Sequence, residues 1–514
     1  MNILQRCLLT ATFLYAGNVT AQKKEPPKPP ISIDKSGQIN YLPDSVGNTI
    51  PDYSFAGYKG GNEAIPNVPV VLILQAQQGD NTAYIQAAID QVAKLPLKNG
   101  IRGAVLLKAG TYNVGGTLVL NTSGVILRGE GVNKTKILGT GFTRQNLIEI
   151  KGQSDFNKSD SIQVEDKYVP VGSFSFSVSN ATKLKVGTTI FIERLSNQAW
   201  LDSLDVVHFG GGLTNLGWKP NQRNVIWDRT ITAIKGNTIT VDAPITTALD
   251  SKYGGTVIQA YDWNGRIENA GIENLTLEST YNAQNIKDED HRWMAIVIDN
   301  ASNSWVRQVN TRNFAGSAVA VWQGANKITV EDVKYLNPVS EIGGQRRSAF
   351  ITEGGQVLFQ RLYSEGAYHD FVTGYCAPGP IAFVQCQGDR AYGFSGGLDS
   401  WSSGILFDNI RLDGSALSLG NRGQDGQGAG WTNANSTLWQ ISASLVELYR
   451  PPTAQNWAFG VWAQFKGNGS WWESNNSINP QSLYYTQLAA RLGKDVLKRA
   501  HLMDLPSEPS SGPR

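Results

Sequence analysis

A four-residue word of the form apolar, any, polar, apolar recurs six times between Ile272 and Ala443. The copies end at Leu275, Val309, Val333, Leu362, Cys386 and Ile410, at spacings of 34, 24, 29, 24 and 24 residues. A weaker copy spans residues 439–442. A period near two dozen, with surplus residues between copies, is typical of stacked coils with variable loops. We interpret each copy as a strand that turns a corner at its polar third residue, so the repeat predicts a parallel β-solenoid.

Composition narrows the class of protein. The chain has 514 residues and a formal net charge of +2, which does not resemble the basic footprint of a nucleic-acid binder. Charged residues make up only 17%, and there are 54 Gly and 14 Trp against 3 Met. This mixture favours a turn-rich β protein with an aromatic surface over a helical enzyme.

The N-terminus predicts export. Arg6, an apolar stretch from Leu8 to Ala16 and the small residues up to Ala21 have the pattern of a cleavable signal peptide over residues 1–21. We therefore expect a secreted or periplasmic protein. The apolar stretch is too short to cross a bilayer, and no later run of 18 apolar residues follows. Cys376 and Cys386 then remain as a pair that could either form a disulfide or be two small buried side chains.

The rest of the chain divides by local pattern. Residues 22–50 contain a Pro-rich linker and an N-terminal lead. Residues 51–158 hold a capping helix, with Asp80 as its N-cap, and the first coils; the helix has apolar positions at Ile85, Ala88, Ile89 and Val92. The coil spacing disappears over residues 159–256, where a hairpin signal around Gly236 predicts an antiparallel β insertion. The main coils occupy residues 257–480, and residues 481–514 predict a C-terminal helix followed by a disordered tail over 505–514.

Three segments carry a family resemblance. Residues 80–90 (Asp-Asn-Thr, then Ile-Gln-Ala-Ala-Ile-Asp), residues 108–112 (Lys-Ala-Gly-Thr-Tyr) and residues 124–129 (Gly-Val-Ile-Leu-Arg-Gly) resemble the opening of pectate-lyase-superfamily proteins. The resemblance implies an all-β, right-handed parallel β-helix that is secreted. It also implies an enzyme acting on polysaccharides, either a lyase of uronic-acid polymers or a glycoside hydrolase.

When the coils are aligned on the repeated word, several basic side chains fall at similar positions. They are His291, Arg346, Arg347, His369 and, slightly off the alignment, Arg390. Neighbouring strands lie about 4.8 Å apart, so we expect these side chains to form one row. A His at a solenoid corner could also do no more than hydrogen-bond its neighbours, and Arg346 and Arg347 could simply pair with surface carboxylates such as Glu341 or Glu365.

Such a row suits β-elimination from a uronate. Arg347 or Arg346 would neutralise the carboxylate, because the guanidinium fork matches carboxylate geometry. His369 would take the C5 proton, Tyr368 would protonate the leaving oxygen, and His291 would be a second base or a substrate contact. Arg390 is a further substrate contact. Of four Trp near the row, Trp293, Trp322, Trp401 and Trp431, we expect sugar stacking above all from Trp293 and Trp401, although a Trp is more often core.

Other interpretations stay open. Asp288, Glu289 and Asp290 could ligate Ca2+ or form a solvated loop, and we expect no cofactor. A hydrolase could draw two carboxylates from Asp370, Asp389 and Asp399, and a non-catalytic glycan-binding solenoid would need only the aromatic residues. The sequence favours a monomeric lyase whose partner is an acidic polysaccharide, without nucleic acid and without a membrane span.

Overall fold

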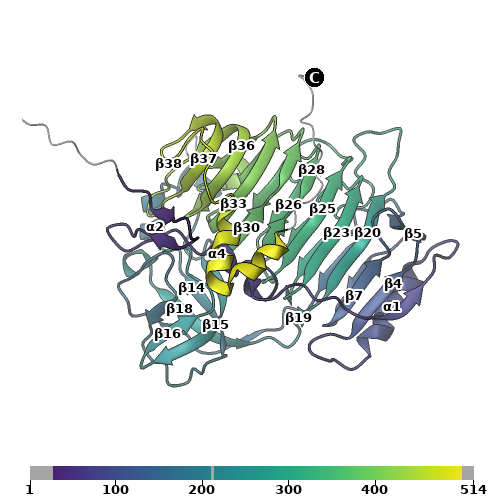
Figure 1. Cartoon of the computed structure of the whole chain (residues 1–514), viewed down its shortest axis with the longest axis horizontal. Helices are drawn as coiled ribbons and strands as arrows, with labels where there is room; N and C mark the ends of the chain where they lie inside the picture. The colour runs from purple at the N-terminus through teal and green to yellow at the C-terminus, as the bar shows by residue number, and fades with distance from the viewer. Residues whose placement is uncertain (1–26, 210–213, 501–514) are drawn as a thin grey trace, which may run out of the picture.

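The computed structural model describes residues 27–209 and 214–500, so the predicted signal peptide and the predicted disordered tail lie outside the described residues. The chain winds into a continuous parallel sheet of 25 strands (Figure 1). Successive coils pair strand on strand along three faces, which we call sheets A, B and C. This confirms the predicted all-β parallel β-helix.

Each sheet takes one strand, or half of a long bent strand, from every coil. Sheet A contains the whole strands β3 (Val70–Leu74), β4 (Gly103–Leu107), β7 (Val125–Gly129), β27 (Leu358–Gln360), β30 (Pro378–Val384) and β38 (Ser470–Trp472), and the first part of β37 (Trp457–Lys466). It also contains the first halves of five long bent strands, β20 (Gly271–Ser279), β23 (Trp305–Arg312), β25 (Thr329–Leu336), β33 (Ser402–Asp413) and β36 (Thr437–Leu448). Sheet B contains β5 (Gly110–Val114), β8 (Thr135–Gly139), the second halves of β20, β23, β25 and β33, β28 (Tyr363–Glu365) and β31 (Gln387–Asp389). The end of β36, from Leu445, pairs with β34 and belongs to sheet C. Sheet C contains β6 (Leu118–Leu120), β9 (Ile148–Lys151), β21 (Ile296–Asp299), β24 (Val319–Val321), β26 (Ser348–Thr352), β29 (His369–Thr373), β32 (Phe394–Gly397) and β34 (Ala416–Leu419).

The repeated word marks the corner between sheets A and B. Leu275 pairs with Val309 and Val309 with Val333, as the repeat predicts. The polar third residue of every copy has a positive φ between 53° and 61°; these residues are Asn274, Gln308, Asp332, Arg361, Gln385, Asn409 and Gln440. The seventh copy is shifted by one residue from our assignment, because Ile410 pairs with Ile441. Each corner is therefore a single residue in the left-handed region, where a short polar side chain is tolerated best.

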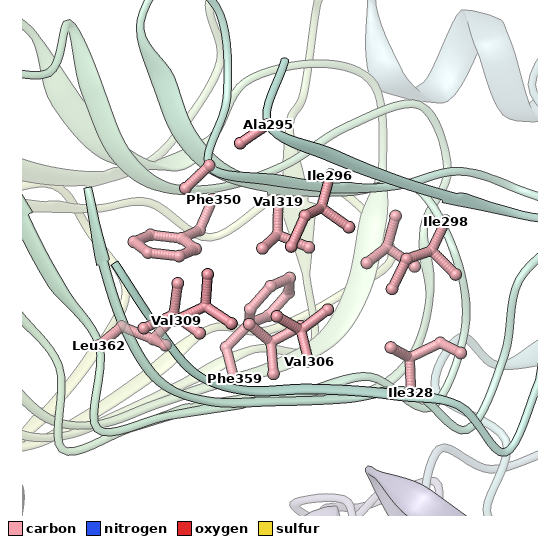
Figure 2. Packing of buried hydrophobic residues seen from close by; sticks show 14 of the residues in the cluster. Ala295, Ile296, Ile298, Val306, Val309, Val319, Ile328, Phe350, Phe359 and Leu362 are labelled. Carbon is pink, nitrogen blue, oxygen red and sulfur yellow. The ribbon is translucent and has the colours of Figure 1, made fainter. Parts of the chain in front are cut away.

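The inward side chains form an apolar core that runs through the coils. Ile296, Val319 and Phe350 of sheet C face Val306 and other apolar residues of sheet A (Figure 2). Aromatic rings repeat from coil to coil, and the Phe359, Phe383 and Phe407 rings stack with centroids 4.7 Å and 5.2 Å apart. Close packing of this kind fixes the register of the stack.

Helices cover the stack where the sequence predicts them. Helix α1 (Thr82–Ala93) buries the predicted face of Ile85, Ala88, Ile89 and Val92 against the first coils. Its N-cap is Asn81 rather than Asp80, whose carboxylate instead accepts the Thr82 and Gly115 N–H groups. Helix α4 (Leu483–Leu492) lies against sheet A, and the 3-10 helix η5 (Lys494–Arg499) follows it (Figure 1).

An antiparallel sheet leaves the stack after β9 and returns before β20. It is built from β10 (Asn157–Lys158), β11 (Ile162–Gln163), β13 (Ser175–Ser177), β14 (Thr189–Arg194), β15 (Val225–Lys235), β16 (Thr238–Val241) and β18 (Thr256–Asp262). A short helix, α2 (Gln198–Leu204), connects β14 to β15. The predicted hairpin is β15 paired with β16. We call this unit the insertion; it lies to one side of the coils (Figure 1).

Two further features bear on the sequence predictions. Cys376 and Cys386 are free and buried, so they form no disulfide. In residues 27–209 and 214–500, no helix is both long and apolar enough to cross a membrane.

The interior also holds a buried acid, which predicts a pH effect on stability. Burial raises the pKa of Asp370 to about 7, Ser364 donates a hydrogen bond to its Oδ1, and Oδ2 has no hydrogen-bond partner among the described residues. The folded state keeps this proton while the unfolded chain loses it near its ordinary pKa, so the stabilisation present below about pH 4 is lost as pH rises to about 7. Asp370→Asn should therefore match the wild type at pH 4 and unfold at a higher temperature at pH 8, by circular dichroism. If the midpoint of Asp370→Asn differed from that of the wild type by the same amount at pH 4 and at pH 8, this assignment would be contradicted.

Candidate active site

The predicted basic row lies at the upstream ends of the sheet C strands, but its members do not share one position. The register aligns Ile296, Val319, Phe350 and Phe371. His369 stands two residues before Phe371, Arg347 three before Phe350, and His291 five before Ile296. Only the middle of the row is contiguous, since the Arg347 carbonyl accepts the Tyr368 and His369 N–H groups at 2.9 and 3.1 Å.

His369 is almost completely buried at the start of β29. Burial lowers the pKa of its imidazole to about 4, and the Arg422 charge acts in the same direction. Its Nδ1 lies 2.7 Å from the Phe394 carbonyl, and its ring packs edge-on against Tyr368 and Phe394. His369 is thus neutral and held by its neighbours, and its role as a base stays a prediction.

His291 is fully buried, and both ring nitrogens contact the protein. Nδ1 lies 3.1 Å from Ser279 Oγ, while Nε2 lies 3.0 Å from the Val339 carbonyl and 3.2 Å from that of Asp288. The expectation of a second base or substrate contact is therefore wrong for this conformation, because neither nitrogen is accessible.

The arginines of the row are engaged within the protein. Arg347 is buried and donates to Ser340 Oγ and to the Ser340 carbonyl at 3.0 and 2.6 Å, and burial lowers its pKa. Arg346, which is one-third exposed, pairs with Glu289, and Arg390 pairs with Glu365. Arg346 and Arg390, each about one-third exposed, are the two members of this group that reach solvent.

Two acids of the loop near the row, Glu289 and Asp290, pair with arginine. Glu289 pairs with both Arg346 and Arg144, and these contacts lower its pKa. Asp288 accepts the Asn282 and Asp290 N–H groups. Across the described part of the chain, no three His, Cys, Asp or Glu side chains gather as a metal site requires.

The tryptophans divide between core and surface. Trp401 is fully buried beneath the insertion, where it packs edge-on against Trp200 at 4.8 Å and donates to Thr247 Oγ1. Trp431 is half-buried in the same cluster and donates to the Leu204 carbonyl. The expectation of a sugar platform is therefore wrong for Trp401. Trp293 is half-buried, and Arg144 lies 5.7 Å from its ring centroid.

A cleft of about 710 Å3 lies at the opposite, downstream end of sheet C, between its loops and the insertion. One wall is the outer face of the antiparallel sheet, with Phe191 and Glu193 on β14 and Ile226 and Asp228 on β15. The other wall is formed by the residues that follow β21, β24, β26 and β29, namely Asp299–Asn300, Trp322–Asn326, Glu353–Gly355 and Tyr375–Cys376. The volume falls within the range of pockets that enclose a small ligand or a few sugar units.

The register places three of these wall residues on successive coils. Ile298, Val321 and Thr352 are direct neighbours, so the residues that follow them, Asp299, Trp322 and Glu353, lie one strand spacing apart in turn. The two carboxylates are thus about 9.6 Å apart at the backbone, with Trp322 between them. In the next coils a glycine leaves room for each one: a Cβ on Gly324 would lie 2.7 Å from Asp299 Oδ1, and one on Gly374 would lie 3.4 Å from Glu353 Oε1.

Glu353 has the electrostatics of a proton donor. Burial raises its pKa to about 7, and the charge of Asp399 and then that of Asp299 add to the effect against a hydrogen bond from Gln323. A carboxylic acid that is half protonated near neutral pH is suited to general acid catalysis.

The cleft walls are joined by buried polar contacts. Arg229 is fully buried and donates to the carbonyls of Ala243, Pro244 and, across the junction, Gly379 at 2.7 Å. Burial lowers its pKa to about 10. Because these carbonyls would otherwise be buried without partners, Arg229 fixes the insertion against the coils.

The chain has weak structural similarity to solved structures of a phage tailspike, a bacterial surface adhesin and a polygalacturonase. It resembles the tailspike protein gp49 of Pseudomonas phage LKA1 with 13% identity and a TM-score of 0.41, over 77% of this chain and 71% of that one. For PfbA, a surface adhesin of Streptococcus pneumoniae, the values are 11%, 0.39, 80% and 93%. For polygalacturonase from Erwinia carotovora ssp. carotovora they are 11%, 0.35, 81% and 98%. Residues 469–514 match the model of a domain of unknown function, DUF6298.

The placement of Trp401 makes a stability prediction. Trp401→Ala should lower the free energy of unfolding by about 3–5 kcal/mol, because it leaves a cavity between the coils and the insertion. The control Trp293→Ala should cost markedly less, since that ring is half-exposed. Denaturant titration of both variants measures the difference, and equal losses would contradict the assignment of Trp401 to the core.

Proposed function

We propose that the protein is a polysaccharide-degrading enzyme, and that it is a glycoside hydrolase with Glu353 as general acid and Asp299 as general base. The observation that carries this proposal is the placement of Asp299, Trp322 and Glu353 on successive coils inside the cleft, where burial also raises the pKa of Glu353 to about 7. Glu353 protonates the glycosidic oxygen as the bond to the anomeric carbon breaks. Asp299 takes a proton from the water that attacks that carbon from the other side.

The spacing of the two carboxylates supports single displacement. Inverting hydrolases hold their carboxyl groups about 6.5–9.5 Å apart to leave room for the water. Asp299 and Glu353 stand two coils apart, about 9.6 Å at the backbone, which is closer to this range than to the spacing of about 5 Å in retaining hydrolases. Trp322 lies between them and supplies an aromatic surface on which a sugar ring can stack. The product should therefore have inverted anomeric configuration.

A lyase acting on uronic-acid polymers is the second candidate, and one observation on the cleft favours it. Lys158 on the insertion wall is exposed and lies 5.1 Å from the centroid of Phe191, where it could neutralise a sugar carboxylate. An acidic polysaccharide is consequently our proposed substrate class for either chemistry. Secretion and a monomeric state belong to the same proposal.

Glu353→Gln tests the acid directly. The variant should lose on the order of 10²–10⁴-fold in kcat, the usual contribution of a positioned acid, while the exposed control Glu341→Gln should keep wild-type activity. The assay follows reducing ends and ultraviolet absorbance together on polygalacturonate, alginate and xylan. Ultraviolet absorbance from a new C4–C5 double bond would indicate a lyase. If His369→Ala then lost this activity and Glu353→Gln kept it, the lyase would replace the hydrolase as the proposed function. Binding without either signal would leave a non-catalytic glycan-binding protein.

Asp399→Asn tests the electrostatic origin of the Glu353 pKa. Glu353 acts when protonated, so activity should fall as pH rises through about 7. Removing the Asp399 charge lowers the Glu353 pKa, and the alkaline limb of the kcat profile should move to lower pH. Asp290→Asn, exposed and outside the cleft, is the control and should leave the limb unchanged. A limb that stays in place in Asp399→Asn would show that Glu353 is not the titrating acid.

A further inference from the structure

One coil after Glu353 along the stack, side chains join the insertion to the coils. The Tyr375 hydroxyl donates to the Gln222 carbonyl at 2.6 Å. Arg223 donates through Nη1 to the Tyr375 hydroxyl at 3.1 Å and through Nε to Ser400 Oγ at 2.8 Å. We call Gln222, Arg223, Tyr375 and Ser400 the bridge.

Aromatic contacts hold the bridge in place. The Arg223 guanidinium lies 4.6 Å from the ring centroid of Tyr375 and 5.5 Å from that of Trp218. A planar guanidinium between two rings gains cation–π attraction on both sides. The bridge is therefore a fixed wall of the cleft.

The insertion also contacts the coils along the length of the cleft. Asp228 on the insertion pairs with Arg266 and accepts a hydrogen bond from Asn326 Nδ2 at 2.8 Å, in the Trp322 coil. Arg229 reaches the Gly379 carbonyl in the Tyr375 coil at 2.7 Å. The cleft continues past Asn326 to Asp299 on the preceding coil, so these contacts do not mark its end away from the bridge.

The bridge lies close to the reacting groups. Tyr375 follows Gly374, which the register places beside Glu353, so the bridge stands about 4.8 Å beyond the Glu353 coil and about 9.6 Å beyond the Trp322 coil. That distance admits one or two sugar units between the point of cleavage and the wall. Tyr375 and Gln222 both line the cleft, so the bridge joins its two walls at this coil.

We infer that the enzyme acts on chain ends, and that the bridge sets the length of the product by closing the cleft behind the first one or two sugars. This inference rests on the proposed function and adds its mode of action. Tyr375 and Arg223 determine specificity and do not take part in the chemistry.

The wild-type enzyme tests the inference on whichever of polygalacturonate, alginate and xylan it degrades. Viscosity should fall slowly for each reducing end released, and chromatography should show mono- or disaccharide as the earliest product. Rapid loss of viscosity with long early oligosaccharides would overturn the inference while leaving the hydrolase intact. Failure to release reducing ends from any polymer would instead overturn the proposed function, and the inference with it.

A matched pair of variants tests the bridge itself. Tyr375→Ala removes the ring and should add longer oligosaccharides to the early products, at least doubling their share. Tyr375→Phe keeps the ring but loses the hydroxyl contacts to Gln222 and Arg223, so its product pattern should lie between those of the wild type and Tyr375→Ala. If Tyr375→Ala does not fold, as judged by its thermal midpoint, Arg223→Gln loosens the same wall and should shift the products in the same direction. Unchanged products in a folded bridge variant would contradict the assignment of chain-end action to the bridge.

Discussion

The in-register hydrogen bonding of one coil to the next is the constraint on which the rest of the structure depends. It turns positions that are dozens of residues apart into neighbours about 4.8 Å apart. Asp299, Trp322 and Glu353 share the downstream edge of sheet C for this reason alone. A slip of one residue would turn these side chains into the apolar interior, and the stacked Phe359, Phe383 and Phe407 rings oppose such a slip.

The insertion converts this edge into a site. An outward carboxyl on a solvated sheet would titrate near its ordinary pKa. Glu353 and the insertion line the same cleft; burial raises the pKa of Glu353 to about 7, and the charges of Asp399 and Asp299 act in the same direction. Arg229 and Trp401, both fully buried at the junction, hold the insertion and the coils together.

The sequence predicts the fold well because the information is local and repeated. The polar third residue of each word predicts the corner, and Ile85, Ala88, Ile89 and Val92 predict the buried face of α1. The cleft could not be predicted in this way. It depends on where the insertion lies against sheet C, which is set by contacts such as that of Arg229 with Gly379, 150 residues away. The histidines and arginines led the sequence prediction to the N-terminal ends of the sheet C strands. Asp299 and Glu353, at the C-terminal ends, belong to no motif that marks them as a site. The sequence could have predicted the site from one pattern: an acid at the end of each of two sheet C strands, with Trp322 at the same position on the coil between them.

The location of the bound glycan tests the account most directly. A crystal structure of Glu353→Gln with an oligosaccharide of the polymer that the wild type degrades should show a sugar over Trp322, between Asp299 and residue 353. The chain should end at Tyr375. A sugar bound instead at the upstream end of sheet C, beside Arg346 and His369, would contradict the account and restore the basic row as the site.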